Sequence, residues 1–195
     1  ATVMGLPLGV LSAVKQYSPA DSFLRVASTV LVAMPTFWLA MLLILVFALY
    51  LGWLPAGGAL TWQSYILPTI TVGVPYGSKV LRMTRSTMLE EIRQDYVRTA
   101  RSKGVPEKKV IYGHALKNAL LPVITTIGSA FGAILGGSVI AESVFNLPGL
   151  GSLIVLSIKA KDTPSVLASV LLLAVFFALI MLIVDLVYAF IDPRI

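Results

Sequence analysis

The chain of 195 residues is 57% hydrophobic and only 12% charged, and its mean hydropathy is +0.91. These values exclude an ordinary water-soluble surface and indicate a protein of the lipid bilayer. The chain has no cysteine, which excludes disulfides and thiolate chemistry. Its formal net charge of +6 is interpreted as a sign of membrane topology, because Lys and Arg collect in cytoplasmic loops.

Uncharged runs predict one partial and four complete membrane spans. The partial span covers about residues 1–14, short of the roughly 20 residues that a helix needs to cross the bilayer, so we expect further sequence upstream. Complete spans are expected at residues 26–51, 65–80, 119–141 and 166–191. Pro35 should kink the first of these. Pro and Gly residues weaken the second, whose backbone needs neighbouring helices or a cavity to satisfy it.

Basic residues predict the orientation of the chain. Residues 79–117 hold ten Lys and Arg against four acidic residues, and this surplus of six equals the net charge of the whole chain. The loop at about residues 82–118 is therefore expected in the cytoplasm. Alternation of the spans then puts residues 52–65 and 142–163 outside and the C-terminus in the cytoplasm.

The sequence pattern of the basic loop predicts two short helices joined by a turn at a glycine. Apolar residues recur at helical spacing up to Gly104, which favours the end of a helix, and Pro106 suits the first turn of the next one. A basic helix-turn-helix can bind DNA, but tethering to the bilayer at both ends argues against a nucleic-acid partner. The two apolar stripes indicate contact with another protein or with the chain's own spans.

At this loop the chain resembles a known family. DYVRTARSKG followed by ALKNALLP is similar to the EAA loop of the membrane subunits of bacterial ATP-binding-cassette importers. Arg98, Thr99 and Ala100 stand where the general pattern has E-A-A, and this departure is like the peptide and nickel subfamily. PTFWLAMLLILVFALYLGWLPAGG, ESVFNLPGLGSL and LIVDLVYAFIDPRI agree with the first of the two paralogous permeases of dipeptide or oligopeptide importers.

The resemblance implies an all-α, polytopic membrane protein with a MetI-like importer-permease helical bundle as one domain over residues 1–195. It implies transport of peptides or a related small solute, including a nickel complex, across a bacterial or archaeal inner membrane. The implied partners are ABC ATPase subunits, a second paralogous permease, an extracytoplasmic substrate-binding protein and membrane lipid. No cofactor is implied. In the family the loop's short helix inserts into the ATPase, and the matching positions here are Tyr96, Arg98, Thr99, Ala100 and Gly104.

Glycines recur every four residues in the span at 119–141. Gly128, Gly132 and Gly136 fall on one helix face, a spacing that lets another helix approach closely. We therefore expect them to pack against a neighbouring helix.

Two carboxylates and one histidine are the other candidate site residues. Asp185 lies inside the last span and is assigned to a structural partner before a substrate or proton site. Glu142 is expected at the outer mouth of its span, where a gate or binding-protein contact and an ordinary interfacial charge both stay open. His114 has no second His or Cys partner, which favours packing over metal ligation. Arg82 and Arg85 are interpreted as topology anchors, that is, basic residues that keep the end of a span on the cytoplasmic side.

Missing motifs narrow the function class. The sequence has no G-x-x-x-x-G-K-[ST] phosphate loop and no H-E-x-x-H, and its single His leaves no hydrolytic triad. Hydrolytic activity of the chain itself is therefore not expected, and the resemblance implies a non-catalytic subunit with ATP hydrolysis on a partner. The alternatives are a secondary transporter driven by an ion gradient, with Asp185 or Glu142 as the coupling carboxylate, and then a membrane-embedded enzyme.

Overall fold

The computed structural model describes the backbone of residues 1–191 and the side chains of residues 1–135 and 138–186. That part of the chain is helical and contains no strand, so the predicted all-α class is confirmed. The helices form two compact units, one of residues 1–32, 75–129 and 183 onward, the other of residues 33–74 and 130–182. The division falls inside three long helices: α4 (Ile66–Ile92), α7 (Leu116–Val144) and α9 (Thr163–Ile191).

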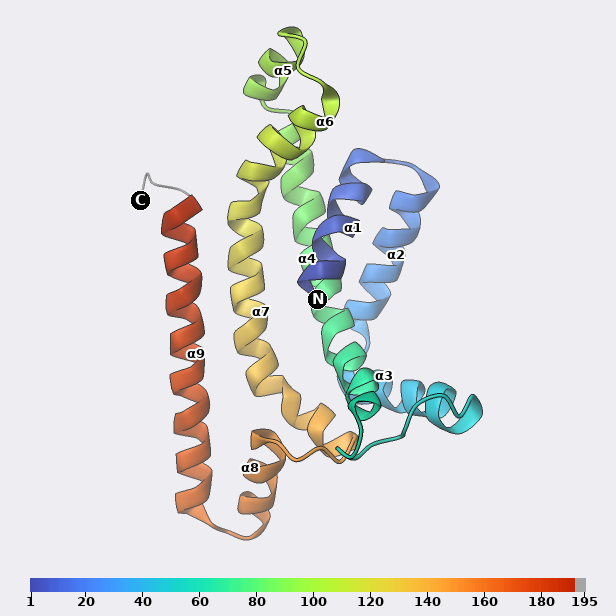
Figure 1. Cartoon of the computed structure of the whole chain (residues 1–195), viewed down its shortest axis with the longest axis vertical. Coiled ribbons are helices and arrows are strands. Elements are labelled where there is room, and N and C mark those ends of the chain that lie inside the picture. Colours follow the sequence, from blue (N-terminus) through green and yellow to red (C-terminus); the bar gives the residue numbers. More distant parts are fainter. Residues whose placement is uncertain (192–195) are drawn as a thin grey trace. The chain divides into compact units, whose positions relative to one another are not determined.

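In the first unit a helical hairpin packs on α4. The hairpin consists of α1 (Thr2–Val14) and α2 (Pro19–Ala33), which lie side by side in Figure 1. A Cβ atom added at Gly5 would lie 2.4 Å from the carbonyl oxygen of Gly77, and one at Gly9 would lie 2.7 Å from that of Leu81. The absence of these side chains lets the backbones of α1 and α4 touch, as small residues do at membrane helix crossings.

The expected span at residues 26–51 is broken and not merely kinked. Helix α2 ends at Ala33, and α3 (Thr36–Leu43) begins after Pro35 and continues as the π-helical stretch η1 (Ile44–Tyr50). Proline has no amide hydrogen for the helical ladder, and its ring disfavours a helical conformation of the residue before it. By length and composition these two helices qualify as a membrane span only when they are taken together.

Fewer helices qualify individually than the four complete spans expected. Among the described residues, the helical run Glu107–Leu135 and residues Thr163–Leu186 of α9 are long and apolar enough to cross a membrane, and the broken pair raises the number to three. Helix α4 does not qualify, because its apolar half is followed by charged residues from Lys79 onward. α1 and α8 (Leu150–Lys159) are shorter apolar helices.

The core of the second unit joins the end of α7 to α3 and the start of α4. Its buried residues are Ala40, Leu67, Ala141 and Phe145. The Phe145 carbonyl oxygen accepts the Gly58 amide at 2.8 Å, and a Cβ at Gly57 would lie 2.4 Å from that oxygen. The loop after η1 is thereby attached to α7 before the chain enters η2 (Trp62–Tyr65) and α4.

Gly128 and Gly132 of α7 face α9, each within its own unit. In the first unit a Cβ at Gly128 would lie 2.9 Å from the Val184 side chain, and in the second a Cβ at Gly132 would lie 2.1 Å from the Phe177 ring. At both positions α9 lies close to the α7 backbone. The surroundings of Gly136 lie outside the described residues.

Candidate functional site

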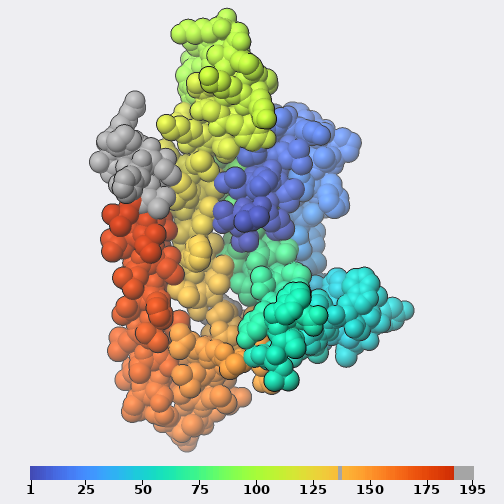
Figure 2. Space-filling model, in the orientation of Figure 1, coloured from blue at the N-terminus to red at the C-terminus, as the bar shows by residue number. Residues whose placement is uncertain are grey.

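The candidate site is the segment from Gln94 to Lys109, which we call the coupling segment. It contains α5 (Asp95–Ser102), a turn and α6 (Glu107–Lys109), which continues as the π-helical η3 (Val110–Ala115). Within the first unit these helices lie beyond the end of α4 (Figure 1), and their atoms stand out past those of α1 and α2 in Figure 2. The predicted helix, glycine turn and helix are therefore present.

An apolar cluster holds α5 from one side. Val97 is 0% exposed and packs into this cluster. The buried members come from α1, α4, α5, η3 and α7: Val10, Ala13, Met88, Val97, Val110, Ile111, Ala115 and Ala119. Burial of one Val side chain contributes about 1.5–3 kcal/mol. α5 therefore sits on a base formed by four other elements.

The opposite face of α5 is open. The side chains of Arg98 and Asp95 are 75% and 97% exposed, and their ion pair, at 3.7 Å, is of the exposed kind that contributes little. Arg98 is thus available to another anion. The Tyr96 hydroxyl donates to the Glu91 carboxylate, and partial burial together with that hydrogen bond raises the pKa of Tyr96 to about 12. Tyr96 therefore presents a neutral ring.

The turn after α5 is a Schellman motif. Gly104 has a φ of +76°, its amide donates to the Arg101 carbonyl at 2.9 Å, and the Val105 amide donates to the Ala100 carbonyl at 3.2 Å. These two bonds satisfy carbonyl groups that the helix end leaves free. Ala100 and Val105 both pack against the apolar cluster, the hydrophobic contact that accompanies this motif.

An ion pair closes the turn from outside. Arg101 donates to Glu107 twice, from Nε at 3.1 Å and from Nη2 at 2.6 Å. The Arg101 guanidinium lowers the pKa of the Glu107 carboxyl, and that carboxylate raises the pKa of Arg101. A bidentate pair fixes orientation as well as distance. The turn is thus fixed on the inside by apolar contact and on the outside by charge.

The structure brings the sequence-predicted residues onto this one segment but gives them different surroundings. Tyr96, Arg98 and Thr99 lie on exposed turns of α5, whereas Ala100 is half-buried against the cluster. Gly104 is exposed and has no atom within 4 Å of an added Cβ. The pattern did not reveal the Arg101–Glu107 pair, because a separation of six residues across a turn matches no helical spacing.

The first unit contains a second polar site, which the sequence patterns did not predict. Arg85, expected to be a topology anchor, pairs with Asp21, which lies ahead of the expected span 26–51 and is 0% exposed. Arg85 Nε and Nη2 lie 2.7 and 2.9 Å from the two carboxylate oxygens, and Ser12 Oγ and the Tyr17 amide donate to the same carboxylate at 2.5 and 3.0 Å. No local pattern signals a pair 64 residues apart.

Glu142 is used inside the second unit. Its carboxylate accepts the Ser152 amide at 2.9 Å and the Ser138 hydroxyl at 2.9 Å, so it occupies the N-terminus of α8. A Cβ at Gly149 would lie 2.4 Å from that carboxylate, which explains the glycine there. A carboxylate at a helix N-terminus is stabilising. Its observed contacts are thus those of a helix cap.

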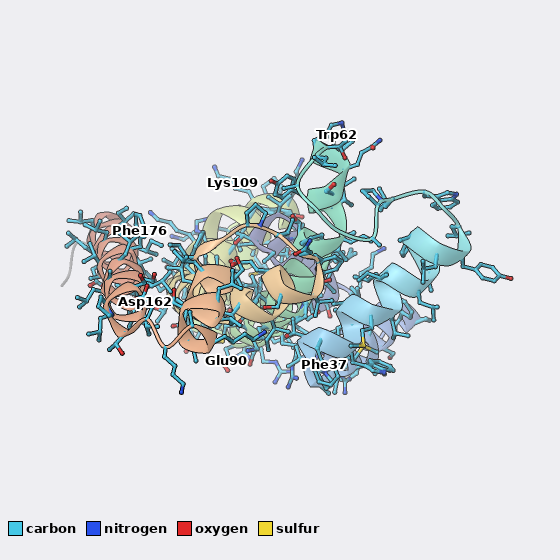
Figure 3. All side chains as sticks on the ribbon, turned by 90° about the horizontal axis from the view of Figure 1, so that it is seen from below. Phe37, Trp62, Glu90, Lys109, Asp162 and Phe176 are labelled. Carbon is cyan, nitrogen blue, oxygen red and sulfur yellow. The ribbon has the colours of Figure 1, made fainter. Side chains whose placement is uncertain are left out.

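Asp185 and His114 lie apart from these contacts. Asp185 is exposed on α9, whose side chains stand out around the helix axis in Figure 3, where Phe176 is labelled. Among the described side chains none forms an ion pair or hydrogen bond with Asp185. His114 is half-buried on η3, and the described residues contain no group of three His, Cys, Asp or Glu able to hold a metal.

The chain is similar to known proteins both in sequence and in fold. The family model described as "Binding-protein-dependent transport system inner membrane component" matches residues 5–195. The glutathione transport system permease protein GsiC of Pectobacterium atrosepticum is 45% identical over 198 residues, and GsiC of Escherichia coli K12 is 44% identical over 195. Each alignment covers 100% of this chain and 64% of the relative, so the chain spans about 64% of the relatives' length.

A solved structure has the same fold. A chain of the methionine ABC transporter MetNI in an inward-facing conformation superposes with a TM-score of 0.79, at 19% identity, covering 98% of this chain and 87% of that chain. At this identity the likeness supports the fold alone. The helical-bundle fold expected from the sequence is confirmed.

Proposed function

Because the chain belongs to the family of binding-protein-dependent transport system inner membrane components, we propose that it is the membrane-spanning permease subunit of an ATP-binding-cassette importer. The chain has no catalytic role in this proposal, since ATP hydrolysis belongs to a partner ATPase pair. A second, paralogous permease completes the pathway, and a substrate-binding protein delivers the solute from outside. The basic surplus of the coupling segment supports a cytoplasmic position for it, and hence for the C-terminus.

The solute in this proposal is a small peptide or a related compound. Glutathione is the first one to test, because relatives with 44–45% identity are named glutathione permeases. Dipeptides and nickel complexes follow from the resemblance of the loop. In this proposal the binding protein supplies most of the selectivity among these solutes.

The observation that carries the proposal is the coupling segment itself. Its inner face is fixed by Val97, its turn is fixed by Gly104, and its outer face presents Tyr96, Arg98 and Thr99. A rigid helix with an exposed arginine and aromatic ring has the composition of an interface centre. We infer that the partner ATPase holds this face, and that its closure displaces α5 together with the cluster below.

The energy source is the direct test of the function. The full-length importer should be reconstituted in vesicles with its ATPase, second permease and binding protein, and uptake of labelled glutathione and of a dipeptide measured. Uptake should require internal ATP and the loaded binding protein. Uptake that persists after ATP depletion while a proton gradient is maintained would favour the secondary transporter and overturn the proposal.

The docking face has its own test. Arg98→Glu should weaken ATPase binding by at least about tenfold, because loss of an interface arginine costs about 2 kcal/mol and about 1.4 kcal/mol is a factor of ten. Binding is measured by titrating the purified ATPase onto the permease in nanodiscs. Lys159→Glu, an equal charge change at the end of α8, is the control and should bind normally. Equal affinities for both variants would place the ATPase elsewhere.

A further inference from the structure

The buried Asp21 carboxylate is fully engaged. Two nitrogen atoms of Arg85, the Ser12 hydroxyl and the Tyr17 amide all donate to its two oxygens. These donors come from α1, from the turn before α2 and from α4, so one carboxylate ties three parts of the first unit together. Tyr17 has a φ of +64°, a conformation that a tyrosine rarely adopts and that the surrounding contacts must hold in place.

The same helices carry the base of the coupling segment. Ser12 precedes Ala13, and Arg85 lies three residues, nearly one helical turn, before Met88. Ala13 and Met88 both belong to the cluster that buries Val97 of α5. The polar network and the apolar cluster are therefore adjacent contacts between the same two helices.

The two contacts constrain the helices differently. Apolar packing is non-directional, so the cluster does not specify which polar group of one helix must meet which group of the other. A buried bidentate pair has one geometry, and leaving either partner unpaired in a buried site is strongly unfavourable. Asp21 and Arg85 thus add a directional constraint on the α1–α2 hairpin to the close approach of α1 and α4 at Gly5 and Gly9.

We propose that Asp21 and Arg85 are positioning residues that make the α1–α2 hairpin follow the coupling segment when the partner ATPase closes. The inference rests on the proposed function and identifies the contact that links the α1–α2 hairpin to the coupling segment. Displacement of α5 reaches α1 and α4 through Val97 and the cluster, and the ion pair converts that push into movement of the hairpin as one body. Without the pair, ATP is hydrolysed but the hairpin does not follow.

The test compares solute uptake per ATP hydrolysed in the reconstituted full-length importer. Asp21→Asn removes the charge with little change in size. The double variant Asp21→Leu, Arg85→Met replaces the pair by apolar side chains, a change that often preserves or raises stability. Both variants should assemble with the ATPase and hydrolyse ATP, and both should lose at least about tenfold in uptake per ATP. Arg82→Gln, which removes an exposed cation one turn away, should keep the wild-type ratio.

Two outcomes would overturn the proposal. Either the double variant transports with the wild-type ratio, or uptake and hydrolysis fall in parallel with the amount of assembled complex in both variants, which would give the pair a stabilising role only. Failure of the proposed function is seen separately, because the wild-type importer would then show no ATP-dependent uptake.

Discussion

Gly104 shows how a single residue sets the geometry of the site. A Cβ at this position meets nothing within 4 Å, so steric clash does not select glycine there. The selection comes from the backbone, because a φ of +76° lies in the left-handed region that L side chains rarely adopt. Substitutions should therefore rank by their tolerance of that region and not by their size.

Replacement of Gly104 gives a graded prediction. Gly104→Val should cost at least about 1–2 kcal/mol at the turn, displace the Schellman bonds and lower stimulation of the ATPase severalfold. Gly104→Asn should stay within about twofold of the wild type, because Asn tolerates positive φ. ATP hydrolysis by the reconstituted complex is the measurement. If both variants lose stimulation equally, contact with the partner and not backbone strain selects the glycine.

The sequence predicted some of these residues and not others for a physical reason. Gly104 stands between an amphipathic stretch and a proline, and such local signals mark a turn. The Asp21–Arg85 and Arg101–Glu107 pairs depend on how distant or turn-separated residues meet in space. Arg85 was interpreted as a topology anchor, and its pairing with Asp21 was not predicted.

At the scale of helices, α1 and α4 approach each other closely in the first unit. The contact depends on Gly5 and Gly9, four residues apart, and the same reasoning that singled out the α7 glycines applies to them. A Cβ at Gly9 would also lie 2.6 Å from the Thr84 Cβ, so a methyl group requires the helices to separate. By contrast, a Cβ at Gly113 meets only the Lys109 side chain at 3.6 Å.

Gly9 and Gly113 offer a matched pair of alanine substitutions, one at a tight contact and one at an open position. Gly9→Ala should destabilise the protein by about 1–3 kcal/mol, the usual cost of overpacking. Gly113→Ala should be neutral or stabilise by up to about 1 kcal/mol, because alanine loses less conformational freedom on folding. Thermal unfolding in detergent, followed by tryptophan fluorescence, measures both. A Gly9→Ala protein as stable as the wild type would show that α1 and α4 do not touch there.

The helical elements were easier to anticipate than their boundaries. Long uncharged runs located α7 and α9, because hydropathy alone decides such helices. Pro35 was recognised, but the sequence could not distinguish a kink from the complete break between α2 and α3. The role of Glu142 was also open, because capping of α8 depends on a turn that brings Ser152 to it.

At the scale of the whole molecule, the composition predicted a protein of the lipid bilayer, and the motifs predicted the family to which the chain belongs. Each unit leaves large apolar side chains exposed, Phe23 in the first unit and Phe176 in the second among them. Exposed apolar surface of this extent requires lipid or protein to cover it. The sequence reports that requirement through hydropathy, but it contains no local signal for which side chains meet across the fold.

The Asp21–Arg85 pair also constrains the order of folding during synthesis of the chain. Its two members are separated by 64 residues, and at about 5–20 residues per second the ribosome adds the second about 3–13 s after the first. During that interval the carboxylate has no guanidinium and needs water, since a lone buried charge is costly. The polar network that ties the α1–α2 hairpin to α4 is therefore completed only after α4 has been made.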